Sequence, residues 1–291
     1  MNNVTKHQIG FILFGELFIL YTFIANEGFV NLTINNSFVY FSVLLIASIG
    51  VSHGAMDGKL IWQASSKTLM RAKIFSSYLL LVLIGLVIWF VVPMAGLILL
   101  IIMSCAHFAK SDLFFTNQLN TFSKYCWGIS VTLLPLIFQP NEVLNIFYLL
   151  TNYEFSMVLI NIVRALIVFS IIVFIASAIL FYKNKFEIIL ALFELVTLIL
   201  LAIFVHPITW FAIYFCGLHG IRALIGINFN FKKDILWLTA FTIPVIVLFI
   251  FLVKENTFDL TNNLLVVFPI LASLTIAHMS LNKIIRAFRN Y

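Results

Sequence analysis

Ten apolar stretches follow one another along this 291-residue chain, with only short polar breaks between them. A helix needs about 20 mostly apolar residues to cross the hydrocarbon core of a bilayer. The chain is 63% hydrophobic and 10% charged, whereas a soluble domain is about half apolar and about a quarter charged. Because too little polar surface remains to cover a water-exposed globule, the sequence excludes a soluble enzyme, a nucleic-acid-binding module and a disordered chain.

The apolar stretches predict an all-α fold, a polytopic transmembrane helix bundle of about ten helices (8–10) in a single integral membrane domain, residues 1–291. The fourth and fifth stretches are short, so a re-entrant pair is the alternative for them. The predicted spans are 9–25, 38–58, 74–92, 94–109, 125–138, 157–182, 187–205, 208–228, 235–253 and 262–281.

Basic residues indicate the orientation of this bundle. With the N-terminus inside, fourteen of the 17 Lys and Arg residues fall on the cytoplasmic side, as the positive-inside rule requires. Both termini are therefore predicted to be cytoplasmic. The first apolar run follows Lys6 as a signal peptide would, but it contains Glu16 and lacks a small-residue cleavage site. We therefore expect it to be a retained helix.

The six histidines separate into two groups under this topology. His7 is expected in the cytoplasmic tail and His206 at an outer turn, where neither needs a functional explanation. The other four lie in the cytoplasmic halves of spans 2, 4, 8 and 10, and they are His53, His107, His219 and His278. Ionisable residues inside a membrane usually face the bundle interior or a functional cavity, and neutral imidazole binds iron, zinc and copper. Four imidazoles at one depth thus suggest one metal site, with interhelical hydrogen bonding as the alternative.

Two aspartates and an arginine accompany these histidines. Asp57 lies four residues after His53 and shares its helix face, where a carboxylate can fix the tautomer of a ligating histidine. Asp112 lies five residues after His107, and a solvated charge at the helix end is the favoured interpretation. Arg222, three residues after His219, either holds a carboxylate or extends to the cytoplasmic interface.

Two glutamates, Glu16 and Glu194, also lie within predicted spans. Each is expected to be a protonated hydrogen-bonding residue, and membership of a polar network is the alternative. The chain contains no phosphate-binding loop, dinucleotide fingerprint, nucleophile elbow or His-Glu-x-x-His pair. The dense histidine boxes expected of a membrane desaturase are absent as well.

Four short segments resemble the Brp/Blh-type membrane proteins, the bacterial β-carotene 15,15′-dioxygenase family. Ser52-His53-Gly54-Ala55-Met56-Asp57 resembles the His-Gly-Ala-x-Asp signature of that family most closely. His107-Phe108-Ala109-Lys110-Ser111-Asp112 resembles His-Phe-Gly-x-x-Asp, with Ala109 where glycine is usual. The segment 214–222 resembles Tyr-Phe…His-x-x-Arg-His, and Ala277-His278-Met279 resembles a late Pro-His-Met.

The chain departs from the family pattern at one position. Where the family has a second histidine directly after the arginine, this sequence has Ala223. The resemblance implies iron held by histidines, so the expected ligands are His53, His107 and His219. Either His278 or water then takes the remaining position, and we predict His278. The residues expected to support the ligands are Asp57, Asp112 and Arg222.

The resemblance also implies a function. Fe(2+) with open positions for O₂ would support cleavage of the central double bond of β-carotene to two retinal molecules. The implied partners are β-carotene or a related carotenoid, O₂, membrane lipid and a retinal-binding rhodopsin, with no nucleic acid. The implied location is the bacterial plasma (inner) membrane, as a multi-pass protein. The alternatives are a non-catalytic or altered-specificity relative that binds carotenoid or retinal, which Ala223 favours, and a membrane transporter, which the lack of a repeat disfavours.

Overall fold

The computed structural model describes residues 2–25, 36–50, 54–116, 119–180, 186–255 and 260–289. Every regular element within these ranges is a helix, which confirms the all-α prediction. Seven helices in the described ranges are long and apolar enough to cross a membrane: Asn3–Ile24, Thr68–Val91, Pro93–Ser111, Met157–Leu180, Phe186–Phe204, Pro207–Gly226 and Phe268–Arg289. The chain is therefore a multi-pass membrane protein, while the count of ten spans and the cytoplasmic termini stay predictions.

Several helices extend beyond the apolar runs that predict them. Helix α1 (Asn3–Ala25) and α5 (Thr68–Val91) begin before the predicted spans 9–25 and 74–92, and α15 (Leu260–Arg289) continues past the predicted 262–281. Backbone hydrogen bonding continues through polar residues at these ends, so hydropathy underestimates helix length. Helices α6 (Pro93–Ser111), α10 (Met157–Leu180), α11 (Phe186–Phe204) and α14 (Phe231–Glu255) match predicted stretches closely. At 19 residues α6 is long enough to span by itself.

The predicted stretch 125–138 is broken. It forms α7 (Thr121–Leu133) and α8 (Pro135–Phe138), which meet at Leu134 and Pro135. Proline has no backbone N–H to donate and fits the first turn of a helix, which explains the restart. A further helix, α9 (Pro140–Thr151), forms where the sequence predicts a loop.

Two of the predicted spans contain π-helical turns. Helix α2 (Asn36–Leu45) leads into η1 (Ile46–Gly50), and α4 (Asp57–Ala64) begins at the end of the predicted span 38–58 and continues beyond it. The predicted span 208–228 consists of α12 (Pro207–Ala212), η2 (Ile213–Gly220) and α13 (Ile221–Gly226). π-Helical turns are rare and frequently mark functional sites, and η2 carries His219. His53 lies outside the described residues.

The described chain forms two compact units, each assembled from three stretches of sequence. Unit 1 comprises residues 1–46, 104–146 and 154–228, and unit 2 comprises residues 47–103, 147–153 and 229–291. The single-domain prediction stays a prediction.

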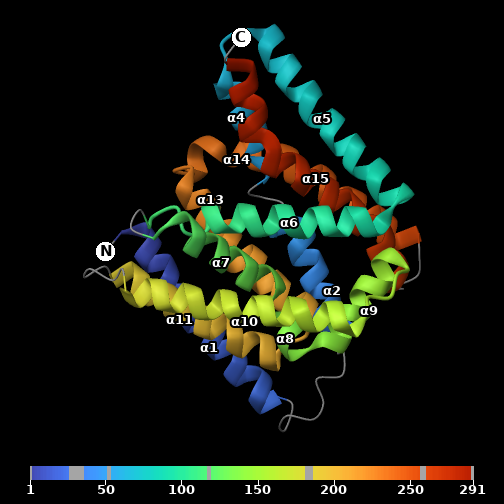
Figure 1. Cartoon of the computed structure of the whole chain (residues 1–291). Coiled ribbons are helices and arrows are strands. Elements are labelled where there is room, and N and C mark those ends of the chain that lie inside the picture. Colours follow the sequence, from blue (N-terminus) through green and yellow to red (C-terminus); the bar gives the residue numbers. More distant parts are fainter. Residues whose placement is uncertain are drawn as a thin grey trace. The chain divides into compact units, whose positions relative to one another are not determined.

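In unit 1, α1 packs against α11 and α7 packs against α10 (Figure 1). Trp127, Phe174 and Trp210 are among the largest fully buried side chains of its core. A side chain at Gly128 of α7 would collide with the backbone carbonyl of Cys105 on α6. Glycine thus permits the close helix approach that is common between membrane helices.

In unit 2, α5 and α15 pack along each other, as the cyan and red helices of Figure 1. Ile74 and Tyr78 of α5 are buried together with Ala277 and Leu281 of α15. A side-chain carbon at Gly85 would lie 3.0 Å from the Ser273 hydroxyl. This unit therefore uses the same small-residue contact between helices.

Candidate functional site

The predicted histidines lie in different parts of the described structure. His107 of α6 and His219 of η2 belong to unit 1, whereas His278 of α15 belongs to unit 2. His53 lies outside the described residues. The structure therefore brings two of the four histidines together, and convergence of all four stays a prediction.

The His107 and His219 rings are direct neighbours in unit 1. Their centroids lie 5.1 Å apart with an interplanar angle of 67°. Two imidazoles that bind one ion through nitrogen at about 2.1 Å have ring centroids roughly 5 Å apart. The spacing of this pair therefore suits two ligands of a shared metal ion.

Asp112 fixes the orientation of His219. The Nδ1–H of His219 donates to Asp112 Oδ1 at 2.7 Å, while the Tyr214 hydroxyl and the Trp127 indole N–H donate to Oδ2 at 2.7 Å and 3.1 Å. The sequence-based interpretation of Asp112 as a solvated charge is wrong, because its side chain is fully buried. Burial disfavours the charged carboxylate, but His219 and Arg222 beside it hold the pKa of Asp112 below its usual range.

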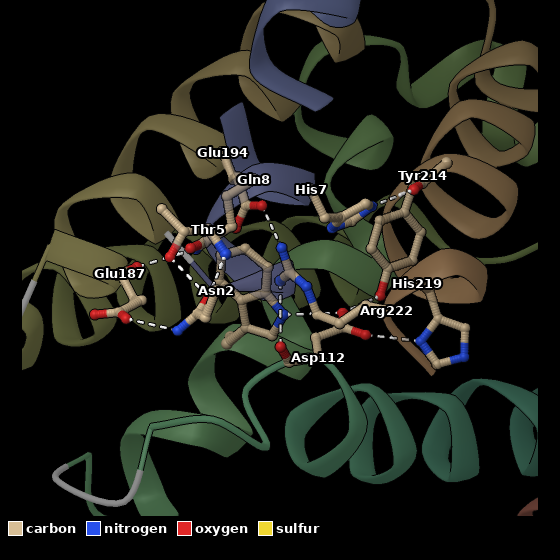
Figure 2. Close-up of polar contacts among 12 residues, drawn as sticks. Asn2, Thr5, His7, Gln8, Asp112, Glu187, Glu194, Tyr214, His219 and Arg222 are labelled. Atoms are coloured by element: carbon tan, nitrogen blue, oxygen red, sulfur yellow. Dashed lines mark hydrogen bonds and ion pairs between the residues drawn. The ribbon is translucent and has the colours of Figure 1, made fainter. Parts of the chain in front are cut away.

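Arg222 connects Asp112 to a second buried carboxylate (Figure 2). Its Nη1 donates to the Asp112 backbone carbonyl at 3.2 Å, and its Nη2 forms an ion pair with Glu194 Oε1. Both side chains of this ion pair are fully buried, so Arg222 holds a carboxylate instead of extending to the interface. Glu194 is accordingly a member of a polar network, the alternative that the sequence left open.

Helix α1 completes this network with two residues that the sequence analysis did not select. Gln8 is fully buried, and its Nε2 donates to the Glu187 carbonyl at 3.0 Å and to Glu194 Oε2 at 3.4 Å. His7 Nε2 donates to the Gly217 carbonyl at 2.8 Å, two residues before His219. The expectation that His7 lies in a tail is wrong, because the residue belongs to α1 and contacts η2. The sequence could not predict this contact, since no local spacing connects residue 7 with residue 217.

Aromatic rings surround His219. The Phe108 ring lies 4.5 Å from it edge-on, and the Phe215 ring is stacked on it at 5.7 Å with an interplanar angle of 14°. The Tyr214 ring lies 6.4 Å away. These rings give His219 aromatic neighbours beside its contacts with Asp112 and His107.

Unit 2 contains a second histidine–aspartate pair. His278 Nδ1 lies 2.8 Å and 3.0 Å from the two carboxylate oxygens of Asp57. The sequence predicted Asp57 as the partner of His53, which lies outside the described residues. The structure thus assigns a partner to Asp57 that lies 221 positions along the chain.

The donor chemistry of these residues fits a metal bound by imidazoles. In both pairs a carboxylate accepts the Nδ1–H, which selects the tautomer whose Nε2 lone pair can bind a metal. Within the described ranges, no three His, Cys, Asp or Glu side chains form a group that could hold an ion. The described part of the chain therefore supplies individual imidazole donors that suit a metal, with His107 and His219 as the adjacent pair.

Comparisons with known proteins identify the family of this chain. A sequence model of the family described as beta-carotene 15,15′-dioxygenase matches residues 44–286. A curated relative named beta-carotene 15,15′-dioxygenase, from the uncultured marine bacterium 66A03, is 31% identical over 191 residues, which cover 62% of this chain. The match spans 66% of the length of that relative, and no solved structure matches. The family match covers most of the chain, which is a member of the beta-carotene 15,15′-dioxygenase family.

Proposed function

We propose that this protein cleaves β-carotene at its central 15,15′ double bond with O₂, giving two molecules of retinal, and that the reaction depends on Fe(2+). The family match over residues 44–286 carries this proposal. The reaction breaks one carbon–carbon double bond and gives each carbon one oxygen atom of O₂. Atoms and electrons balance without an external reductant, so the reaction needs no nucleotide or flavin.

We propose His107 and His219 as two of the iron ligands, with His278 and His53 as the others. Iron(II) bound by neutral imidazoles with an open position supplies the O₂ activation that no amino-acid side chain provides. Asp112 accepts the Nδ1–H of His219 at 2.7 Å, and this contact keeps Nε2 as the basic nitrogen. Asp57 has the same role for His278.

The surroundings of His219 suit an apolar substrate. Phe108 and Phe215 pack on its ring, and Tyr214 directs its hydroxyl to Asp112 at 2.7 Å. The polar groups near the histidine are thereby engaged with one another, and buried aromatic rings line its surroundings, which is a composition that suits a conjugated hydrocarbon. Such a substrate dissolves in lipid, which agrees with the membrane-spanning helices.

The proposed location is the bacterial plasma membrane, and a retinal-binding rhodopsin is the proposed recipient of the product. A second function is favoured by Ala223, which is half-buried one residue after the fully buried Arg222. There the chain lacks the histidine that the family pattern has. A relative that binds carotenoid or retinal without cleaving it is the alternative function.

The test is production of the protein in bacteria that accumulate β-carotene, followed by purification and reaction under air. We expect iron in the purified protein and one retinal pair for each β-carotene consumed. The His219→Ala variant should lose both iron and retinal formation. Iron-loaded protein that binds carotenoid without forming retinal would contradict the catalytic function and support the alternative. Ala223→His then distinguishes an impaired site, which gains activity, from a rearranged site, which does not.

A further inference from the structure

Unit 2 presents a strongly basic surface where four helix ends meet, around α4. The surface comprises the short helix α4, the first turns of α5 and α14, and the last turns of α15 (Figure 1). Helix α4 contacts each of the other three helices. We call this the basic surface; its exposed cations are Lys67, Lys73, Lys232, Lys233, Lys283, Arg286 and Arg289.

An ion pair and two hydrogen bonds hold these helix ends together. Lys59 of α4 pairs with Asp234 of α14 at 2.6 Å. The Arg71 Nε–H of α5 donates to the Ser65 carbonyl at 2.7 Å, and Arg289 of α15 donates to the Ala64 carbonyl at 3.5 Å. The cations of these helices therefore share one local surface of unit 2.

Among the residues that the structure describes at the four helix ends, no exposed acidic side chain balances this charge. The two aspartates there, Asp57 and Asp234, are buried and are engaged by His278 and Lys59 respectively. The first turn of α5 also contains no acidic residue, and its N-cap Lys67 makes no side-chain capping bond. The cations repel one another, and those beside the N-terminus of α5 also repel the positive end of its helix dipole. An external anion would relieve both repulsions.

Aromatic and apolar side chains accompany the cations. The Arg71 guanidinium lies 3.9 Å above the centre of the Trp62 ring, and the Trp62 and Trp237 rings lie 6.1 Å apart. Trp62, Leu69 and Leu236 are 55%, 70% and 76% exposed. Tryptophan beside lysine and arginine at the end of a spanning helix is typical of the headgroup level of a bilayer.

We propose that the basic surface binds the headgroups of anionic phospholipids in the adjacent leaflet. Clusters of four to eight basic residues at the end of a membrane helix attract anionic lipid, and this surface adds apolar side chains that can enter the acyl region. A soluble polyanion would match the charge, but it would leave Leu69 and Leu236 exposed to water. The proposal does not depend on the catalytic function.

The experiment compares phosphatidylglycerol with phosphatidylcholine as neighbours of the reconstituted full-length protein. Each lipid is supplied in brominated form in mixed vesicles, and quenching of tryptophan fluorescence reports which lipid is enriched near the protein. We expect stronger quenching by phosphatidylglycerol and a preference that falls in high salt, because salt screens exposed charges. In the K232Q/K233Q variant this preference should fall about twofold or more.

The matched control is K6Q/K110Q, which removes two exposed cations from unit 1 and should keep the preference. Equal quenching by the two lipids, or an equal loss in the control, would overturn the proposal. Inorganic phosphate should compete no better than chloride at the same ionic strength. Stronger competition by phosphate would identify a site for the free anion and would also overturn it.

Discussion

The two histidine–aspartate pairs share one contact but differ in their surroundings. In unit 1, His219 and Asp112 are both fully buried, and Asp112 also accepts from Tyr214 and Trp127. In unit 2, the side chains of His278 and Asp57 are 17% and 5% exposed. A lost contact in unit 1 therefore leaves fully buried polar groups unpaired, whereas the pair in unit 2 is less completely enclosed by the protein. The difference predicts that the network in unit 1 tolerates substitution far less.

The largest effect is expected for Glu194→Leu. This change leaves the buried Arg222 without its carboxylate, and breaking a buried ion pair destabilises by about 3–5 kcal/mol. Unfolding of the purified protein by denaturant measures the loss. The double variant E194L/R222M removes both charges and should recover most of the stability. A single variant as stable as the parent would show that Arg222 is not held by Glu194.

Substitution of the two aspartates compares the pairs directly. Asp112→Asn should lower iron content and retinal formation about 10- to 100-fold, because the partner of a ligating histidine sets its tautomer. Asp57→Asn should lower both by less, since His278 is partly exposed. Iron per protein after dialysis and retinal formed per minute are the measurements. An equal or larger loss in Asp57→Asn would contradict the difference that we infer between the two pairs.

Much of the fold follows from the sequence. Apolar runs predict the spanning helices because burial in lipid depends on local hydropathy alone. The motif around His107 places Asp112 in the candidate site, although its burial and its bond to His219 depend on how α6 packs against η2. The spacing rules for a single helix cannot supply such contacts.

The contacts missed by sequence analysis join residues far apart in the chain. Gln8 reaches Glu194 across 186 positions, and Asp57 reaches His278 across 221 positions. These pairs depend on which helices become neighbours, and hydropathy carries no information about that choice. The contact of His7 with Gly217 likewise depends on the packing of α1 against η2, which the sequence does not show.

Gln8→Leu tests whether α1 belongs to the network of unit 1, since α1 precedes the family match at residue 44. The variant loses the donor to Glu194 and to the Glu187 carbonyl, so we expect destabilisation of about 1–2 kcal/mol. Denaturant unfolding is again the measurement. The exposed neighbour Lys6 supplies the control, and Lys6→Gln should change stability little. Equal stability of both variants would place α1 outside the network.

The smallest effect concerns the buried Asp234 in unit 2, whose partner Lys59 is partly exposed. The hydrogen bond from Lys59, aided by the Asn230 N–H, holds the pKa of Asp234 below its usual value. The ionised form is therefore favoured in the folded state, and its contribution is present above the unfolded pKa of about 3.9 and lost as pH falls through the folded pKa. We expect the parent protein to lose stability between about pH 5 and pH 3 more steeply than Asp234→Asn, with the two converging at the acid end.

Parallel unfolding profiles over this range would show that the Lys59 contact does not influence the carboxylate. High salt should narrow the difference, because Lys59 is partly exposed and its charge is screened, unlike the fully buried Arg222–Glu194 pair of unit 1.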